Sequence, residues 1–268
     1  MKNNPWIYLG CSLLALLVAS AIFAPALAPH NPNRQNLGND LQVFTAEHPL
    51  GTDKLGRDIL SRTIFGSRIS LLVGVSTVAI SVSIGLFIGS VSGYFGGWLD
   101  QLLMRAVDIL LAFPGILLAI AFTALLGPGL DHVILALCLL GWTGYARLVR
   151  GEILSLKERD HVQAARALGC SAARVIVVHL VPNLLPALLI QATFGLAGAI
   201  IAEGSLSFLG LGVEPPTASW GSMLNEGRQF LLVAPHLTTY PGLAIMLTVL
   251  SLNLVGDALQ NRLQSGKR

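Results

Sequence analysis

Six long apolar runs constrain this chain more than any other feature of its sequence. A helix rises about 1.5 Å per residue, so roughly 20 apolar residues are needed to cross about 30 Å of hydrocarbon. The runs that reach or approach this length are 6–27, 69–91, 102–126, 132–146, 184–209 and 237–259. Backbone hydrogen bonds must be satisfied internally in lipid, so these runs are expected to be helices. The sequence therefore predicts an all-α integral membrane protein with about six transmembrane helices.

Composition supports contact with lipid. Hydrophobic residues make up 53% of the 268 residues and charged residues only 12%, whereas soluble proteins average about a quarter charged. The net charge of +3 is spread along the chain and forms no basic block interleaved with aromatic residues. We therefore expect the lipid bilayer as a partner and no nucleic acid.

The first apolar run has two interpretations. Lys2, the run itself and the small residues at 26–28 are compatible with a cleaved secretory signal. The run is longer than the apolar core of a usual signal and has a single flanking charge, which favours a retained anchor helix.

Basic residues predict the orientation, because cytoplasmic loops carry an excess of Lys and Arg. With the N-terminus inside, an alternating path puts eleven of the 17 Lys and Arg residues on the inner side and six on the outer side. Both termini are therefore expected to be cytoplasmic. The chain is expected to divide into three parts. Residues 1–66 form an N-terminal helix and outer segment, residues 67–260 a five-helix core, and residues 261–268 a cytoplasmic tail.

The two longest connections differ in character. Residues 28–68, on the outer side, are rich in Pro, Asn and Gly, which indicates turns rather than a second packed domain. Residues 147–183, on the inner side, change to an amphipathic pattern. Asp160 is placed to cap a helix through Leu168, and Gly169 to end it in a left-handed conformation. A second helix is expected from Ser171 through Arg174 to Val181.

The spacing of the first of these inner helices puts Val162, Ala165 and Leu168 on one face, with small alanines beside them. Such a face could insert closely into a cleft of a partner protein. The alternative is an amphipathic helix that lies on the membrane surface.

The order of residues in this inner loop resembles a known family. Residues 162–169, followed by His-Leu-Val-Pro-Asn at 179–183, resemble the E-A-A-x-x-x-G loop of inner-membrane permeases of ABC importers. The resemblance is to the type I class and implies a coupling loop at about 151–182 that docks on a cytoplasmic ATPase. The residues to which it assigns docking are Asp160, Val162, Gln163, Ala164, Ala165, Leu168 and Gly169. Gln163 stands where the family usually has Glu, which puts a salt-bridge role for this position in doubt.

Three more stretches narrow the resemblance to the dipeptide, oligopeptide and nickel permease family, and to its C-type subunit. Residues 48–62 are similar to the outer motif G-T-D-x-x-G-R-D, and residues 203–221 and 240–257 also match. The motif residues are Gly51, Asp53, Gly56, Arg57 and Asp58. The charged ones among them are expected to pair with one another and with Arg62, or to meet a binding protein.

The resemblance implies a non-catalytic permease subunit in the bacterial plasma membrane. Its implied partners are a second homologous permease, two cytoplasmic ATP-binding subunits and an outer substrate-binding protein. No G-x-x-x-x-G-K-[ST] phosphate-binding loop is present in the sequence, so ATP and magnesium are expected to be used by the partners. Di- or oligopeptides are the expected cargo, with nickel or glutathione as alternatives.

Asp108 and Glu203 are ionisable residues within apolar runs and are candidates for a translocation path. Each is alternatively a structural group that pairs helices. Glycines and serines recur along residues 74–92 and are expected to permit close helix packing.

Two distant functional alternatives lack support. An intramembrane hydrolase needs a nucleophile with a base or paired metal ligands, but neither G-x-S-x-G nor H-E-x-x-H occurs. A secondary transporter is expected to show an internal repeat, and no convincing repeat is found. We predict no catalytic residue. We also predict no disulfide and no metal site, because the three cysteines match no metal spacing and the six histidines form no cluster along the sequence.

Overall fold

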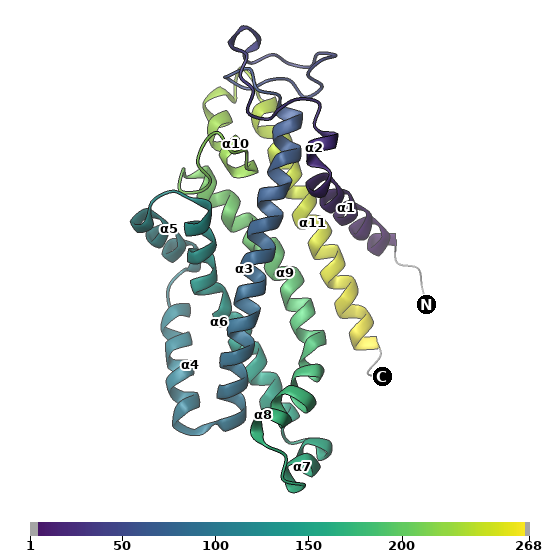
Figure 1. The fold of residues 1–268 in the computed structure, drawn as a ribbon, viewed down its shortest axis with the longest axis vertical. Helices are drawn as coiled ribbons and strands as arrows, with labels where there is room; N and C mark the ends of the chain where they lie inside the picture. Colours follow the sequence, from purple (N-terminus) through teal and green to yellow (C-terminus); the bar gives the residue numbers. More distant parts are fainter. Residues whose placement is uncertain (1–4, 266–268) are drawn as a thin grey trace.

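The computed structural model describes residues 5–265, in which the regular elements are all helices (Figure 1). The principal helices are α1 (Pro5–Ile22), α3 (Ile59–Phe95), α4 (Gly97–Leu111), α5 (Gly115–Leu126), α6 (Leu130–Leu156), α9 (Val181–Phe208) and α11 (His236–Ser265). Shorter elements are α2 (Ala24–Leu27), η1 (Leu37–Asn39), α7 (Asp160–Ala167), α8 (Ala172–Arg174), η2 (Val175–Leu180), α10 (Trp220–Gly227) and η3 (Arg228–Phe230).

Helix lengths confirm an all-α membrane protein. Among the described residues, four helices are long and apolar enough to cross a membrane: α3, α6, the continuous helix 172–208 and α11. The pair α4 and α5 provides a fifth span if its two halves count as one, and α1 is a shorter apolar helix. Each of the six predicted apolar runs is therefore largely helical. The last three predicted tail residues, 266–268, lie outside the described residues, and α11 occupies 261–265.

The third predicted helix, residues 102–126, is wrong as a single element. It is broken between α4 and α5, whose axes differ by 83°. Pro114 lies at the N-cap of α5 with extended backbone. A proline has no N–H to donate and disfavours helical backbone in the residue before it, so the chain turns there.

The second predicted helix begins ten residues too late. Asp58 accepts a hydrogen bond from the backbone N–H of Ser61, which caps α3 and starts it at Ile59 rather than at residue 69. At 1.5 Å per residue, the 37 residues of α3 extend roughly 55 Å. The helix is therefore longer than a hydrocarbon core is thick and projects beyond it.

Glycines bring α3 against α6. A Cβ on Gly85 would lie 2.4 Å from Tyr145 Cβ, and one on Gly89 would lie 2.5 Å from the carbonyl oxygen of Ala146. Neither position has room for a larger residue. The predicted close packing along 74–92 therefore holds for its glycines, and these two helices run side by side through the centre of the molecule (Figure 1).

The second helix of the inner loop does not end before Pro182. The helix begins near Ser171 as expected, with Ser171 at the N-cap, but α8 continues through the π-helical segment η2 into α9. A π-helical turn changes the hydrogen-bond register, and the side chain of Asn183 donates to the carbonyl oxygen of His179 at 2.7 Å. These local adjustments let the helix pass the proline, so α8 continues into the transmembrane helix α9 without a break.

Candidate functional site

The short helix α7 lies at one end of the molecule, opposite the long 28–58 connection and α10 (Figure 1). It runs from Asp160 to Ala167, and Gly169 follows with φ +80°. The left-handed glycine stop was predicted correctly. The capping role of Asp160 was not, because Arg159 occupies the N-cap and no side chain caps the helix. Asp160 lies instead in the first turn, where a carboxylate interacts favourably with the helix dipole.

The two faces of α7 are arranged differently from the prediction. Val162 and Ala165 are buried against the chain itself, whereas Leu168 is 86% exposed. Residue 168 is the C-cap, so the backbone leaves the helix there and the three-residue spacing no longer determines the direction of its side chain. The face that a partner can reach carries His161, Gln163, Ala164, Arg166, Ala167 and Leu168.

Gln163 is exposed but is hydrogen-bonded within its own loop. Its side-chain amide donates to the carbonyl oxygen of Lys157 at 3.0 Å. An ionised glutamate at this position has no proton to donate. The amide therefore gives this loop an internal hydrogen bond that the family's usual carboxylate could not make.

A continuous buried cluster connects α7 to the membrane-spanning helices. From α7 it includes Val162, and from the preceding and following helices it includes Ile153, Leu156, Val175, Leu180 and Leu184. The same cluster extends along α6 and α3 to Tyr145 and Val78. Because protein interiors are close-packed, a displacement of α7 is resisted or transmitted by this cluster rather than absorbed in free space.

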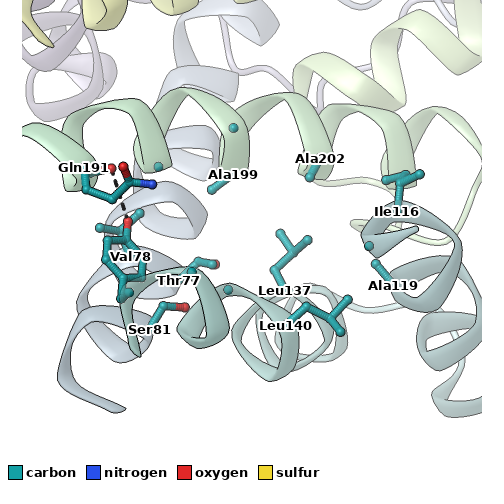
Figure 2. A pocket seen from close by; sticks show the side chains of 16 residues that line it. Thr77, Val78, Ser81, Ile116, Ala119, Leu137, Leu140, Gln191, Ala199 and Ala202 are labelled. Carbon is teal, nitrogen blue, oxygen red and sulfur yellow. Dashed lines mark hydrogen bonds between the residues drawn. The ribbon is translucent and has the colours of Figure 1, made fainter. Parts of the chain in front are cut away.

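Tyr145 and Val78 also line a cavity of about 330 Å³ between α3, α5, α6 and α9 (Figure 2). Glycines and alanines make up much of its wall. They are Gly115, Ala119, Gly141, Gly144, Gly195, Gly198, Ala199 and Ala202. Small side chains leave the space open, so the cavity exists because of the composition of these helix faces.

The cavity wall has a few neutral polar groups. Thr77 Oγ1 and Ser81 Oγ are buried without a hydrogen-bond partner among the described residues, and Gln191 extends from α9 on the opposite wall (Figure 2). None of the lining residues is charged, and none is His or Cys. The exposed amide of Gln191 can therefore offer hydrogen bonds to a solute, and no lining side chain can bind it through an ion pair or a metal.

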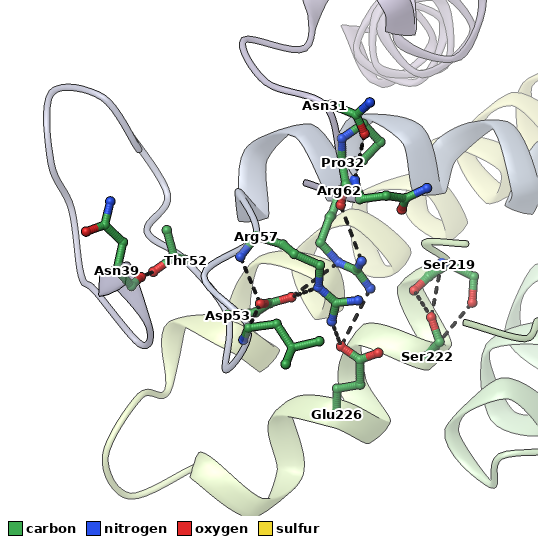
Figure 3. A network of polar contacts seen from close by, with 12 residues as sticks. Asn31, Pro32, Asn39, Thr52, Asp53, Arg57, Arg62, Ser219, Ser222 and Glu226 are labelled. Atoms are coloured by element: carbon green, nitrogen blue, oxygen red, sulfur yellow. Dashed lines mark hydrogen bonds and ion pairs between the residues drawn. The ribbon is translucent and has the colours of Figure 1, made fainter. Parts of the chain in front are cut away.

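At the other end of the molecule, the outer motif forms a buried ion network (Figure 3). Arg57 Nε lies 2.6 Å from Asp53 Oδ2, and Arg57 also pairs with Glu226 on α10. Arg62 lies 3.6 Å from each of the same two carboxylates. Asp53, Arg57 and Arg62 are each at most 5% exposed, so the internal network is observed and little of their surface is available to a binding protein. The participation of Glu226 was not foreseen.

Two motif glycines permit this arrangement. Gly51 and Gly56 have φ of +81° and +67°, where residues with a Cβ are strained. A Cβ on Gly56 would lie 1.8 Å from the carbonyl oxygen of Asn36. The remaining motif carboxylate, Asp58, binds His48 and Ser61 rather than an arginine.

The two candidate path residues do not line the cavity. Asp108 pairs with Arg147 at 2.7 Å and joins α4 to α6, with both side chains more than half exposed. Glu203 is 1% exposed and accepts a hydrogen bond from Ser207 Oγ at 2.7 Å. Their positions favour the helix-pairing and structural alternatives.

Two of the histidines lie together in the fold, whereas the cysteines are not paired with one another. Cys11, Cys138 and Cys170 are free thiols. The histidines do form one cluster, because the rings of His30 and His48 lie 4.7 Å apart. Seventeen residues and several turns separate them in the sequence, which is why the cluster was not foreseen.

Comparison with known proteins assigns a family to this arrangement. Residues 85–268 match the family described as the binding-protein-dependent transport system inner membrane component, and residues 1–43 match the N-terminal transmembrane domain of oligopeptide transport permease C. The first match covers more than half of the chain. The chain belongs to this permease family. It is a translocation component of an ABC importer rather than an enzyme.

Two relatives align with this permease over almost its whole length. It is 41% identical over 263 residues to the dipeptide transport system permease protein DppC of Alkalihalophilus pseudofirmus, covering 98% of this chain and 86% of the relative. It is 44% identical over 252 residues to the glutathione transport system permease protein GsiD of Escherichia coli, covering 92% and 82%.

A solved structure supports the fold of the permease. A chain of the MetNI methionine ABC transporter, in an inward-facing conformation, matches with a TM-score of 0.60 and 22% identity over 75% of this chain and 95% of that chain. The sequence indicated the family and the loop at 160–169. It did not reveal the cavity, although Gln191, the one amide within the apolar run 184–209, was a signal that could have drawn attention to that wall.

Proposed function

We propose that the permease forms one half of a pore through which short peptides are imported, and that cytoplasmic ATPases drive its opening and closing through α7. The observation that carries this proposal is the single buried cluster that contains both Val162 of α7 and Tyr145 of the cavity wall. An ATPase that grips the exposed face of α7 would move Val162 with it. The cluster would transmit that displacement to α6 and α9, and hence to the cavity.

The energy source lies outside this chain in the proposal. No phosphate-binding loop occurs in the sequence, and membership of a binding-protein-dependent family implies ATP-binding and substrate-binding partners. Two ATPase subunits, a second permease and one outer binding protein complete the assembly. ATP and magnesium are bound by the ATPases and not by this chain.

The end that carries α7 is proposed to be cytoplasmic. Its inner connection is rich in Lys and Arg, as cytoplasmic loops are. This orientation directs the ion network of Asp53, Arg57, Arg62 and Glu226 to the outer side, together with the 28–58 connection. Both termini are then cytoplasmic, and the membrane is the bacterial plasma membrane.

The substrate class follows from the cavity and the relatives. Named relatives of similar identity transport a dipeptide and glutathione, which is itself a tripeptide. The uncharged wall and the exposed amide of Gln191 suit the amide bonds of a short peptide, and the absence of ligating side chains from the wall argues against a metal ion as cargo. Glutathione is the second candidate, supported by the 44% identical relative.

Reconstitution tests the proposal. The permease, purified with its partner subunits and placed in vesicles with the binding protein, should take up a labelled dipeptide only when ATP is supplied, and the permease alone should hydrolyse no ATP. Hydrolysis by the isolated chain, or uptake without ATP, would contradict the proposal. An excess of unlabelled glutathione distinguishes the two cargoes, because it should reduce uptake of the labelled dipeptide only if glutathione is also bound and transported.

Two valines provide a matched test of the mechanical link. Val162→Ala removes two methyl groups from the buried cluster, whereas Val177→Ala removes the same groups from a side chain that is 63% exposed. Peptide taken up per ATP hydrolysed should fall for the first variant and stay at the wild-type value for the second. An unchanged ratio in Val162→Ala would remove the support for transmission through the cluster.

A further inference from the structure

Three side chains with metal-binding atoms converge beside the start of α3, on the face of the molecule that carries the 28–58 connection. They are His30, Glu47 and His48, and one ligand atom from each lies within 4.8 Å of the others. None of them belongs to the cavity or to the ion network of Asp53, Arg57, Arg62 and Glu226. The cluster is therefore a separate feature that peptide transport leaves unexplained.

His48 is oriented as metal-binding histidines usually are. Its Nδ1 lies 2.9 Å from Asp58 Oδ1. The other oxygen of Asp58 accepts hydrogen bonds from the backbone N–H of Ser61 at 2.7 Å and from its hydroxyl at 2.6 Å. An ionised carboxylate only accepts, so Nδ1 donates to it, and in the neutral ring that binds metal Nε2 has the free lone pair. A carboxylate that holds a histidine in this tautomer is a regular partner of metal sites.

His30 is held next to His48 by the same helix start. Its backbone N–H donates to Ser61 Oγ at 3.0 Å, and its ring is stacked on that of His48 at a tilt of 36°. Nε2 of His30 lies 3.9 Å from Glu47 Oε1, and its Nδ1 is buried without a hydrogen-bond partner in the part of the chain that the structure describes. The ring thus has an unused nitrogen at a site already lined by a second imidazole and two carboxylates.

We propose that His30, Glu47 and His48 bind a divalent transition-metal cation of the class that prefers imidazole, for which Zn²⁺ is the probe. Two imidazoles and one carboxylate are a ligand set suited to zinc, whereas calcium and magnesium prefer oxygen alone. Bonds of about 2.0–2.2 Å bring tetrahedral ligand atoms to roughly 3.4 Å from one another. The Glu47 side chain, 73% exposed, is free to close this gap.

Charge also favours a cation. The carboxylates of Glu47 and Asp58 face two imidazoles that are neutral when they bind metal, and a divalent ion balances the two negative charges. The bound ion would tie the segment after α2 and the 45–48 turn to the N-terminus of α3. It would act as an outer brace, and the fourth tetrahedral position would be left to water.

Titration with Zn²⁺ tests the site in the full-length permease, purified with its partners and freed of metal by dialysis against a chelator. Competition with a chromophoric zinc chelator should give one strong site per chain. His30→Ala and Glu47→Gln should each weaken zinc binding by at least about tenfold, because each removes a ligand. Both leave the His48, Asp58 and Ser61 contacts in place, so the loss would not come from disruption of the surrounding structure. His161→Ala, which removes an exposed histidine on α7, is the matched control and should bind as the wild type does.

Two further measurements support or overturn the site. Zn²⁺ should raise the melting temperature of the wild type and of His161→Ala, and leave that of His30→Ala unchanged. X-ray absorption of the zinc-loaded protein should show two imidazoles. Wild-type affinity in His30→Ala, equal loss in His161→Ala, or a spectrum without imidazole would overturn the proposal. None of these outcomes depends on peptide uptake.

Discussion

Aspartate substitutions at Ala165 and Ala164 separate the two faces of α7. Ala165 is 6% exposed and faces the chain's own helices, whereas its neighbour Ala164 is exposed. The same new side chain is therefore buried in one variant and exposed to solvent, or to a docked partner, in the other. Both changes reduce helix propensity equally, so this contribution cancels when the two variants are compared.

The expected difference can be worked from burial. A polar group buried without a partner costs at least about 2 kcal/mol. On the exposed face, an aspartate at 164 lies four residues after Asp160, and like charges at this spacing cost about 0.5 kcal/mol. The remaining difference of about 1.5 kcal/mol corresponds to roughly a tenfold difference in the opening equilibrium of α7.

Amide hydrogen exchange measures this equilibrium. In the isolated permease, residues 160–168 should exchange at least about tenfold faster in Ala165→Asp than in Ala164→Asp. Both variants should lose peptide uptake, the first because the loop loses its packing and the second because a charge is placed on the docking face. Equal exchange in the two variants would falsify the assignment of faces.

Three other changes have defined outcomes. Gly85→Ala should lower the free energy of unfolding of the detergent-solubilised permease by about 1–3 kcal/mol through overpacking against Tyr145. Gly144→Ala is the control and should not lower it, because a Cβ there meets no atom within 4 Å. Equal losses in the two variants would contradict the close approach of α3 and α6. Glu226→Gln should destabilise by about 3–5 kcal/mol because it leaves two buried arginines with one carboxylate. The exposed Glu214→Gln is its control, and matching melting curves would contradict the network. Gln191→Leu should raise the KM for peptide uptake with little change in ATP hydrolysis, and an unchanged KM would remove Gln191 from the substrate path.

The sequence by itself determined the membrane environment, the helical class and the family. Long uncharged runs have few physical alternatives in lipid, because the backbone must satisfy its own hydrogen bonds there. Local rules were also sufficient for the left-handed stop at Gly169 and for the start of the next helix near Ser171. These features depend on residues that lie within a few positions of one another.

Local rules failed where a distant segment or a special backbone turn decides the conformation. Leu168 follows the apolar spacing of α7 but is exposed, because the helix has already ended there. Pro182 looked like a helix end, yet a π-helical turn carries the chain past it. The break at Pro114 divides the third predicted helix into two segments 83° apart.

Only the tertiary structure decided which side chains meet. Glu226 is 169 residues from Arg57 and pairs with it, and His30 lies against His48 because Ser61 and Asp58 hold both at the start of α3. The cavity likewise requires four helices whose small residues face one another. Burial, ion pairing and ligand geometry depend on packing between segments that are distant in the chain, and the spacing of residues along one segment does not contain that information.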